Sequence, residues 1–153
     1  MQEYRLDDLG WAEFERLVQA LLKARLGFGI EAWGGERGDW GRDAYFEGDL
    51  VYPSKAVTTG AFVFQSKFVE GANAAGSKPE KALLAAIRKE CDRLLKRFRK
   101  ATCSSPRPTV YALFTNAALT PTIRGKVKEL LSGVLTDSLL QIHDGGDISV
   151  GFA

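Results

Sequence analysis

The residues best suited to do chemistry are Gln65 and Lys67, which stand two positions apart in the segment FVFQSKF at 62–68. This segment is rich in aromatic residues, lacks proline and has glycines close to both ends, which predicts a β-strand. Side chains alternate across a strand, so Gln65 and Lys67 should share one face at a separation of roughly 6.6 Å. A lysine among apolar residues is costly to bury unless it is paired. We therefore expect either a paired lysine at a functional site or a solvated lysine on an edge strand.

Two acidic residues are candidates to join this pair. Asp43 opens the strand expected within 42–51, which should pair antiparallel with 62–68 and bring Asp43 near Gln65 and Lys67. Glu15 lies one helical turn from apolar residues on either side of it, so it borders the apolar stripe of the helix expected at 9–26. A boundary glutamate without function is the commoner interpretation of Glu15.

The charges are unevenly distributed, although the chain as a whole carries a net charge of only +2. Residues 1–77 hold 8 basic and 12 acidic groups, whereas residues 78–107 hold 10 basic and 3 acidic groups. A basic segment beside an acidic one suits a polyanion partner together with a metal-binding centre, although a solvated basic helix is at least as common. The candidate contacts to a nucleic-acid backbone are Arg88, Lys89, Arg93, Lys96 and Arg97.

The elements that position these residues follow an α/β order in a single domain covering residues 1–153. An apolar strand that follows a strand and a long helix indicates a βαβ crossover, so 109–115 should run parallel to 62–68. After 143 the chain should form a turn and then a terminal tail or strand. The expected helices are 9–26, 81–100 and 121–135, and the expected strands are 28–33, the core of 42–51, 62–68, 109–115 and 139–143.

Several functional classes are disfavoured by composition. Cys91 and Cys103 have no histidine nearby and make no zinc site, and His143 is the single histidine, which excludes chemistry that needs two. The glycine-rich segment 34–41 lacks the lysine and the strand-to-helix setting of a nucleotide-binding P-loop. The acidic N-terminus is unlike a signal peptide, and the chain has no long apolar run, so we expect a cytoplasmic protein with no membrane partner.

Four short segments carry a resemblance to a known family. They are EFERLV at 13–18, GDWGRD at 38–43, QSK at 65–67, and FTN at 114–116 followed by Thr120 and Pro121. In this order, and on these elements, the chain resembles the PD-(D/E)xK nuclease superfamily, in particular its Mrr-like restriction-endonuclease branch. The resemblance covers about residues 9 to 144. It implies a restriction-endonuclease-like fold, in which a mixed sheet of four or five strands is flanked by helices on both faces.

The resemblance also implies the roles of the site residues. Asp43 would be a metal ligand, Gln65 a ligand through its side-chain oxygen, Lys67 the catalytic lysine and Glu15 an auxiliary acid. The main-chain carbonyl of Ser66 would complete the protein's share of the ligands. Mg²⁺ is the expected cofactor because it prefers oxygen ligands and keeps several waters, and Mn²⁺ would substitute for it.

The implied function is Mg²⁺-dependent endonucleolytic cleavage of double-stranded DNA, in defence against foreign DNA. One centre per chain would require a homo-oligomer for double-strand breaks. The run Gly-Arg-Asp-Ala at 41–44 also looks like the nuclease domains of Avs-type antiphage proteins, in which a C-terminal NTPase and sensor region follows. The alternatives are a domain of the same fold that binds nucleic acid or assembles without cleaving, and a resolvase of Holliday junctions.

Overall fold

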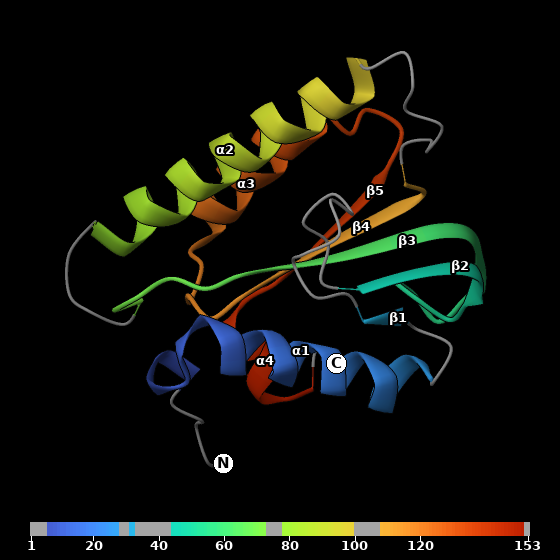
Figure 1. Cartoon of the computed structure of the whole chain (residues 1–153), viewed down its shortest axis with the longest axis horizontal. Coiled ribbons are helices and arrows are strands. Elements are labelled where there is room, and N and C mark those ends of the chain that lie inside the picture. Colours follow the sequence, from blue (N-terminus) through green and yellow to red (C-terminus); the bar gives the residue numbers. More distant parts are fainter. Residues whose placement is uncertain (1–5, 28–30, 33–43, 73–77, 100–107, 152–153) are drawn as a thin grey trace.

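The computed structural model describes residues 6–27, 31–32, 44–72, 78–99 and 108–151, with the backbone alone for 31–32 and 97–99. Its centre is a mixed five-stranded sheet with the strand order β1-β2-β3-β4-β5 (Figure 1). The β1–β2 and β2–β3 pairs are antiparallel, whereas β3–β4 and β4–β5 are parallel. The strands are β1 (Glu31–Ala32), β2 (Ala44–Leu50), β3 (Thr58–Lys67), β4 (Val110–Thr115) and β5 (Leu139–His143).

Helices cover both faces of this sheet, as the sequence predicts (Figure 1). On one face, α1 and α4 pack against a cluster that contains Phe62, Phe64 and Phe114. On the other, α2 and α3 pack against a cluster that contains Val63 and Leu113. The helices are α1 (Gly10–Leu26), α2 (Lys78–Arg99), α3 (Pro121–Ser132) and α4 (Gly145–Ser149), and a 3₁₀ turn, η1 (Leu6–Asp8), precedes α1.

The predicted pairings of β3 are confirmed on both of its sides. The antiparallel register with β2 runs from Ala44 opposite Phe64 to Leu50 opposite Thr58. The parallel partner β4 is reached through the crossover helix α2, as the strand–helix–strand order predicts. β3 begins at Thr58, four residues earlier than expected, because residues 58–61 extend the hairpin with the far end of β2.

The prediction for the end of the chain is wrong in one respect, since residues 145–149 form a short helix where a turn and tail were expected. Asp144 caps it by accepting a hydrogen bond from the Asp147 amide at 3.0 Å, and the Asp147 carboxylate accepts one from the Asp144 amide at 3.1 Å. Reciprocal capping of this kind satisfies two amides that the helix leaves free. Position 145 has no room for a side chain, because a Cβ there would lie 2.4 Å from the Asn116 carbonyl oxygen.

Smaller differences concern where helices begin and end. α2 begins at Lys78, ahead of the expected residue 81, with Pro79 in its first turn, a position that proline favours. α3 begins at Pro121 as predicted, with Thr120 as its cap, and ends at Ser132. A helical hydrogen bond from the Leu135 amide to Leu131 still follows, which explains the longer expectation. Within the described residues, no helix is long and apolar enough to cross a bilayer.

Candidate functional site

The candidate site is built on the carboxyl end of β3, where Gln65, Ser66 and Lys67 complete the strand. Val63 belongs to the cluster beneath α2 and α3, so strand alternation places Gln65 and Lys67 on this same face. Their expected common face is confirmed. Ser66 lies between them, half-buried, opposite Phe114 of β4.

The Lys67 ammonium is paired with a buried acid. Its Nζ donates a hydrogen bond to Oε2 of Glu90 at 3.1 Å, and Glu90 projects from α2 with only 2% of its side chain exposed. Arg93, one turn along α2, bonds both oxygens of the same carboxylate. Lys67 is 23% exposed and Arg93 44% exposed, so a buried carboxylate is shared by two cations that reach the surface. Lys67 is therefore a paired lysine on a central strand.

Gln65 presents a buried acceptor that the described residues leave without a partner. The residue is 4% exposed, and its Oε1 makes no hydrogen bond to any of the described residues. With Glu90, Tyr111 and four apolar neighbours it lines a narrow cavity that has no room for a water molecule. An unsatisfied buried acceptor costs about 1–3 kcal/mol, and in a native fold it calls for a partner such as an ion.

Asp43 lies outside the described residues, so its expected position beside Gln65 and Lys67 stays a prediction. Its neighbour in sequence, Ala44, begins β2 and pairs with Phe64. Both Ala44 and Phe64 belong to the cluster beneath α1. The described end of β2 thus lies next to the part of β3 that carries the candidate residues.

Glu15 lies on the helix that packs against the other face of the sheet. It lies on α1, half-buried, and its neighbour Phe14 packs on Phe68 at a ring-centroid distance of 5.8 Å. α1 covers the sheet face opposite to the one that Gln65 and Lys67 occupy. The auxiliary role of Glu15 stays a prediction, and the carboxylate bonded to Lys67 in the structure is that of Glu90.

Glu90 is the residue that sequence reasoning missed. The chain offered a signal, because Leu83, Ile87, Glu90 and Leu94 recur at spacings of four, three and four residues. This spacing places Glu90 on the buried stripe of α2. An acid on an apolar stripe within a basic helix predicts a buried ion pair. Lys67, on the neighbouring strand, was a candidate for the cation of that pair.

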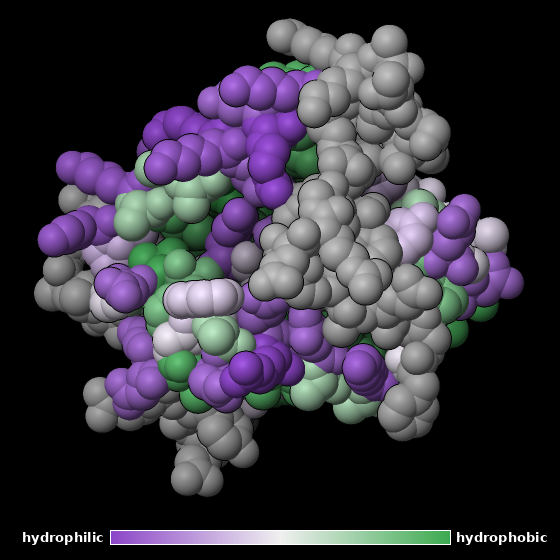
Figure 2. Space-filling model, in the orientation of Figure 1, coloured by the Kyte–Doolittle hydropathy of each residue, from purple (hydrophilic) through white to green (hydrophobic). Residues whose placement is uncertain are grey.

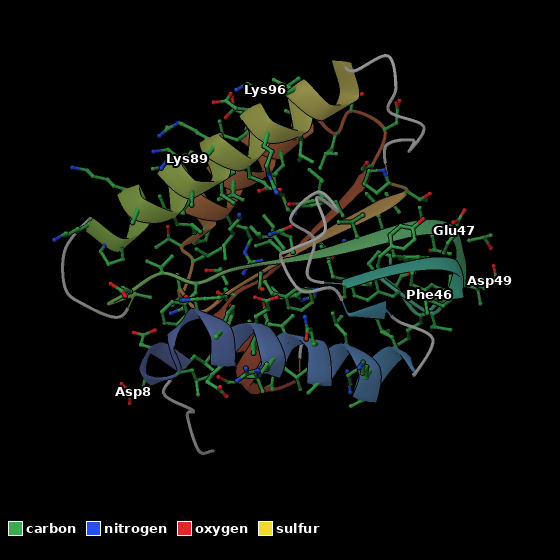
Figure 3. All side chains as sticks on the ribbon, in the orientation of Figure 1. Asp8, Phe46, Glu47, Asp49, Lys89 and Lys96 are labelled. Atoms are coloured by element: carbon green, nitrogen blue, oxygen red, sulfur yellow. The ribbon has the colours of Figure 1, made fainter. Side chains whose placement is uncertain are left out.

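The basic residues of α2 divide into two groups. Arg88, Lys89 and Lys96 are exposed, and Lys89 and Lys96 lie on the side of α2 away from the sheet (Figure 3). Hydrophilic side chains gather over this helix in the space-filling view (Figure 2). Arg93 differs because it is bonded to Glu90. The side chain of Arg97 lies outside the described part. We call Arg88, Lys89 and Lys96 the α2 basic surface.

Asn116 fixes the chain just beyond Lys67. Its Oδ1 accepts a hydrogen bond from the Val69 amide at 2.8 Å, and its Nδ2 donates to the Val69 carbonyl at 2.9 Å. The same Nδ2 donates to Asp7 of η1 at 2.7 Å. Asn116 directly follows β4, so this side chain holds the exit of β3 to the exit of β4.

A second polar pair lies under α1, on the other face of the sheet. The Tyr52 hydroxyl is 2.6 Å from Nε2 of His143, and the His143 ring stacks on Phe114 with centroids 4.8 Å apart. Burial lowers the pKa of His143, against an opposing effect of the Asp147 carboxylate. Burial likewise raises the pKa of Tyr52. Both shifts favour the uncharged forms of the two side chains, as expected for a pair that contributes to the core.

Of the expected metal ligands, Gln65 and Ser66 belong to the described residues, whereas Asp43 does not. Within the described ranges, no three His, Cys, Asp or Glu side chains gather into one group. The expected ligands were a carboxylate at position 43, an amide oxygen and a main-chain carbonyl, and a site with only one carboxylate would not be found as a group of three such side chains.

Searches of family models, of curated proteins and of solved structures each returned no match to this chain.

Proposed function

We propose that this chain is a Mg²⁺-dependent endonuclease that hydrolyses phosphodiester bonds of DNA. The observation that carries the proposal is the end of β3, where Lys67 shares one face with the buried Oε1 of Gln65, an acceptor that no described residue bonds. A cation that can offset phosphate charge thus stands beside an oxygen that can complete a metal's shell. An exposed basic surface lies on the adjacent helix α2.

The fold supports this proposal by its order of elements. A first helix, three strands in antiparallel pairing, a crossover helix and a parallel strand follow one another, and a further helix and strand come after them. This is the order that the resemblance to the Mrr-like branch implies. We propose on this basis that the α/β fold is restriction-endonuclease-like.

In the proposed centre, Asp43, the Gln65 side-chain oxygen and the Ser66 carbonyl would hold the metal. Oxygen donors suit Mg²⁺, and the orphaned Oε1 of Gln65 fits a ligand role. When bound, the metal neutralises the non-bridging phosphate oxygens and activates water. The centre requires β2 to extend one residue toward its N-terminus, from Ala44 to Asp43, because strand alternation would then direct the Asp43 carboxylate to the face of Gln65.

Lys67 acts on the substrate in this proposal. Its ammonium holds the attacking water and offsets the charge that develops on the phosphate. Glu90 fixes the ammonium in place through the 3.1 Å hydrogen bond. The α2 basic surface contacts the DNA backbone away from the cleaved bond, which gives affinity without sequence preference.

The decisive experiment is incubation of supercoiled plasmid with the protein in Mg²⁺ or in EDTA. Cleavage is expected in Mg²⁺ alone, and Lys67→Ala and Asp43→Ala should each abolish it, with DNA affinity nearly unchanged in Asp43→Ala. Lys126→Ala is the matched control, since Lys126 is an exposed lysine of α3. Wild-type cleavage rates in the Lys67→Ala protein would refute this centre.

One observation favours a non-cleaving nucleic-acid-binding domain as the second candidate. Lys67 already has a partner in Glu90, and an ion pair of this kind is also a structural device. Tight DNA binding without any Mg²⁺-dependent product, on linear, supercoiled and branched DNA alike, would select this alternative. Cleavage confined to branched DNA would instead indicate a junction resolvase.

A further inference from the structure

The Lys67–Glu90–Arg93 cluster has an excess of positive charge at its exposed side. Two cations share one carboxylate, so these three side chains carry a net charge of +1. The carboxylate is buried, whereas both cations reach the surface. An anion that approaches from outside would meet the two cations before it meets the acid.

We propose that Lys67 and Arg93 together form a binding site for one phosphodiester phosphate, with Glu90 as the positioning residue between them. The proposal rests on the proposed function in naming DNA as the source of the phosphate. It separates Arg93 from the α2 basic surface, because Arg93 would contact the phosphate at the reacting centre.

The donors available at the cluster suit a phosphate. An arginine has five N–H donors and a lysine three, and the contacts to Glu90 use only Nη2 of Arg93 and one donor of Lys67. Because both cations bond to Oε2 of Glu90, their heads lie close enough for one phosphate group to bridge them. Paired N–H groups of arginine match two phosphate oxygens, and such charge-assisted bonds are the strong ones.

A second ion cluster in the same chain shows the contrast. Arg124 lies 3.3 Å from Asp144 and 3.4 Å from Asp147, and it also donates to the Ile142 carbonyl at 2.6 Å. One cation there meets two carboxylates, so those charged side chains sum to −1, and the arginine ties α3 to the β5–α4 connection. That arrangement is structural, whereas Lys67 and Arg93 have N–H donors beyond those bonded to Glu90 and the three side chains have a net positive charge.

The simplest competing explanation is that Arg93 only neutralises the buried Glu90. The two explanations differ for the double variant Glu90→Gln/Arg93→Gln, whose cluster keeps the wild-type net charge of +1 through Lys67. If neutralisation were the whole role, removal of both charges would restore wild-type behaviour. If Arg93 binds phosphate, the double variant stays defective because the guanidinium donors are absent.

The test measures anion binding without chemistry. Inorganic phosphate is titrated by ³¹P NMR, and a short DNA duplex by fluorescence anisotropy, both in EDTA. The single variants are Arg93→Gln, which brings the cluster to zero charge, and Glu90→Gln, which brings it to +2. Lys81→Gln is the matched control, because Lys81 is an exposed lysine of α2 outside the cluster. Thermal unfolding by circular dichroism establishes that each variant is folded.

Phosphate affinity should fall at least about tenfold in Arg93→Gln and in the double variant, as expected for the removal of charge-assisted hydrogen bonds. It should rise in Glu90→Gln and stay unchanged in Lys81→Gln. Wild-type phosphate affinity in Arg93→Gln, or recovery in the double variant, would overturn the phosphate site. If the predicted binding pattern is found but the wild-type protein cleaves no nucleic acid, the phosphate site stands and the proposed function fails. If the wild type cleaves and Arg93→Gln retains its rate and phosphate affinity, the phosphate site alone fails.

Discussion

Replacement of Asn116 by alanine tests how the fold holds the end of β3. Asn116 is 3% exposed, and its side chain bonds both the amide and the carbonyl of Val69, two residues beyond Lys67. In Asn116→Ala these two buried backbone groups lose their partners. The Asp7 carboxylate also loses its 2.7 Å hydrogen bond from Nδ2.

The size of the effect follows from the number of groups left unsatisfied. Each buried backbone group without a partner costs about 1–3 kcal/mol, so the two groups of Val69 give a loss of roughly 2–6 kcal/mol. A domain of this length is stable by about 5–15 kcal/mol in total. One kcal/mol corresponds to about 2–4 °C in a domain of 150–250 residues. A loss near 3 kcal/mol should therefore lower Tm by roughly 10 °C.

Urea unfolding followed by circular dichroism gives the free energy, and amide hydrogen exchange reports on Val69 itself. The control is Ser132→Ala, because Ser132 is exposed and its hydroxyl makes one 3.0 Å bond to the Glu129 carbonyl. That variant should stay within about 0.5 kcal/mol of the wild type. A loss below about 1 kcal/mol in Asn116→Ala, with the Val69 amide still protected, would refute the reasoning.

Four further expectations can be tested together. Burial lowers the pKa of His143 below its ordinary 6.5, so on acidification the unfolded chain takes up the proton before the folded protein does. The urea concentration at the unfolding midpoint should therefore be lower at pH 5.5 than at pH 7.5, and His143→Gln should remove most of this dependence. Gly145→Ala should destabilise the fold, since its Cβ would meet the Asn116 carbonyl at 2.4 Å, whereas Gly125→Ala, in open space on α3, should stabilise it by up to about 1 kcal/mol; equal unfolding midpoints would contradict this. Neutralising the α2 basic surface should flatten the slope of log affinity against log salt by about 0.9 for each phosphate that the protein no longer neutralises, and an unchanged slope would make that surface a solvated face. If each chain carries one copy of the proposed centre, nicked plasmid should precede linear plasmid, and linear product should rise more steeply with protein concentration; linear DNA without a nicked precursor from a monomer would rule this out.

The fold could be predicted from the sequence because its strands and helices have clear periodicities. The apolar run 109–115 and the long helix before it predict the parallel crossover, and β4 is parallel to β3. The alternation in 62–68 places Gln65 and Lys67 on one face, and both face α2. Local pattern determines which side of a strand a residue occupies, so these features follow without tertiary information.

The partners across the molecule were harder to predict. Glu15 was given its role by the resemblance, and its place at the border of an apolar stripe does not tell which face of the sheet its helix will cover. The helix α4 was also missed. Asp-Gly-Gly-Asp at 144–147 has the composition of a turn, although Asp144 and Asp147 are also spaced as a capping box, which is the local signal that was overlooked. The close approach of Gly145 to Asn116, 29 positions away in sequence, is a tertiary feature that the local pattern does not contain.

The end of β3 is held by contacts from two elements, α2 and the end of β4, and this explains how a lysine can be kept on the face of a central strand. Glu90 of α2 compensates the charge of Lys67 at 3.1 Å, so the ammonium is fixed without being left unpaired in the interior. Asn116 ties Val69 to the end of β4, which sets where the chain leaves the sheet. Among the buried side-chain polar atoms of residues 65–69, Oε1 of Gln65 is the one that the described residues leave without a hydrogen bond. In the proposed centre a cation would complete this acceptor, and the narrow cavity beside Gln65 would then have to open, because it has no room for a water molecule.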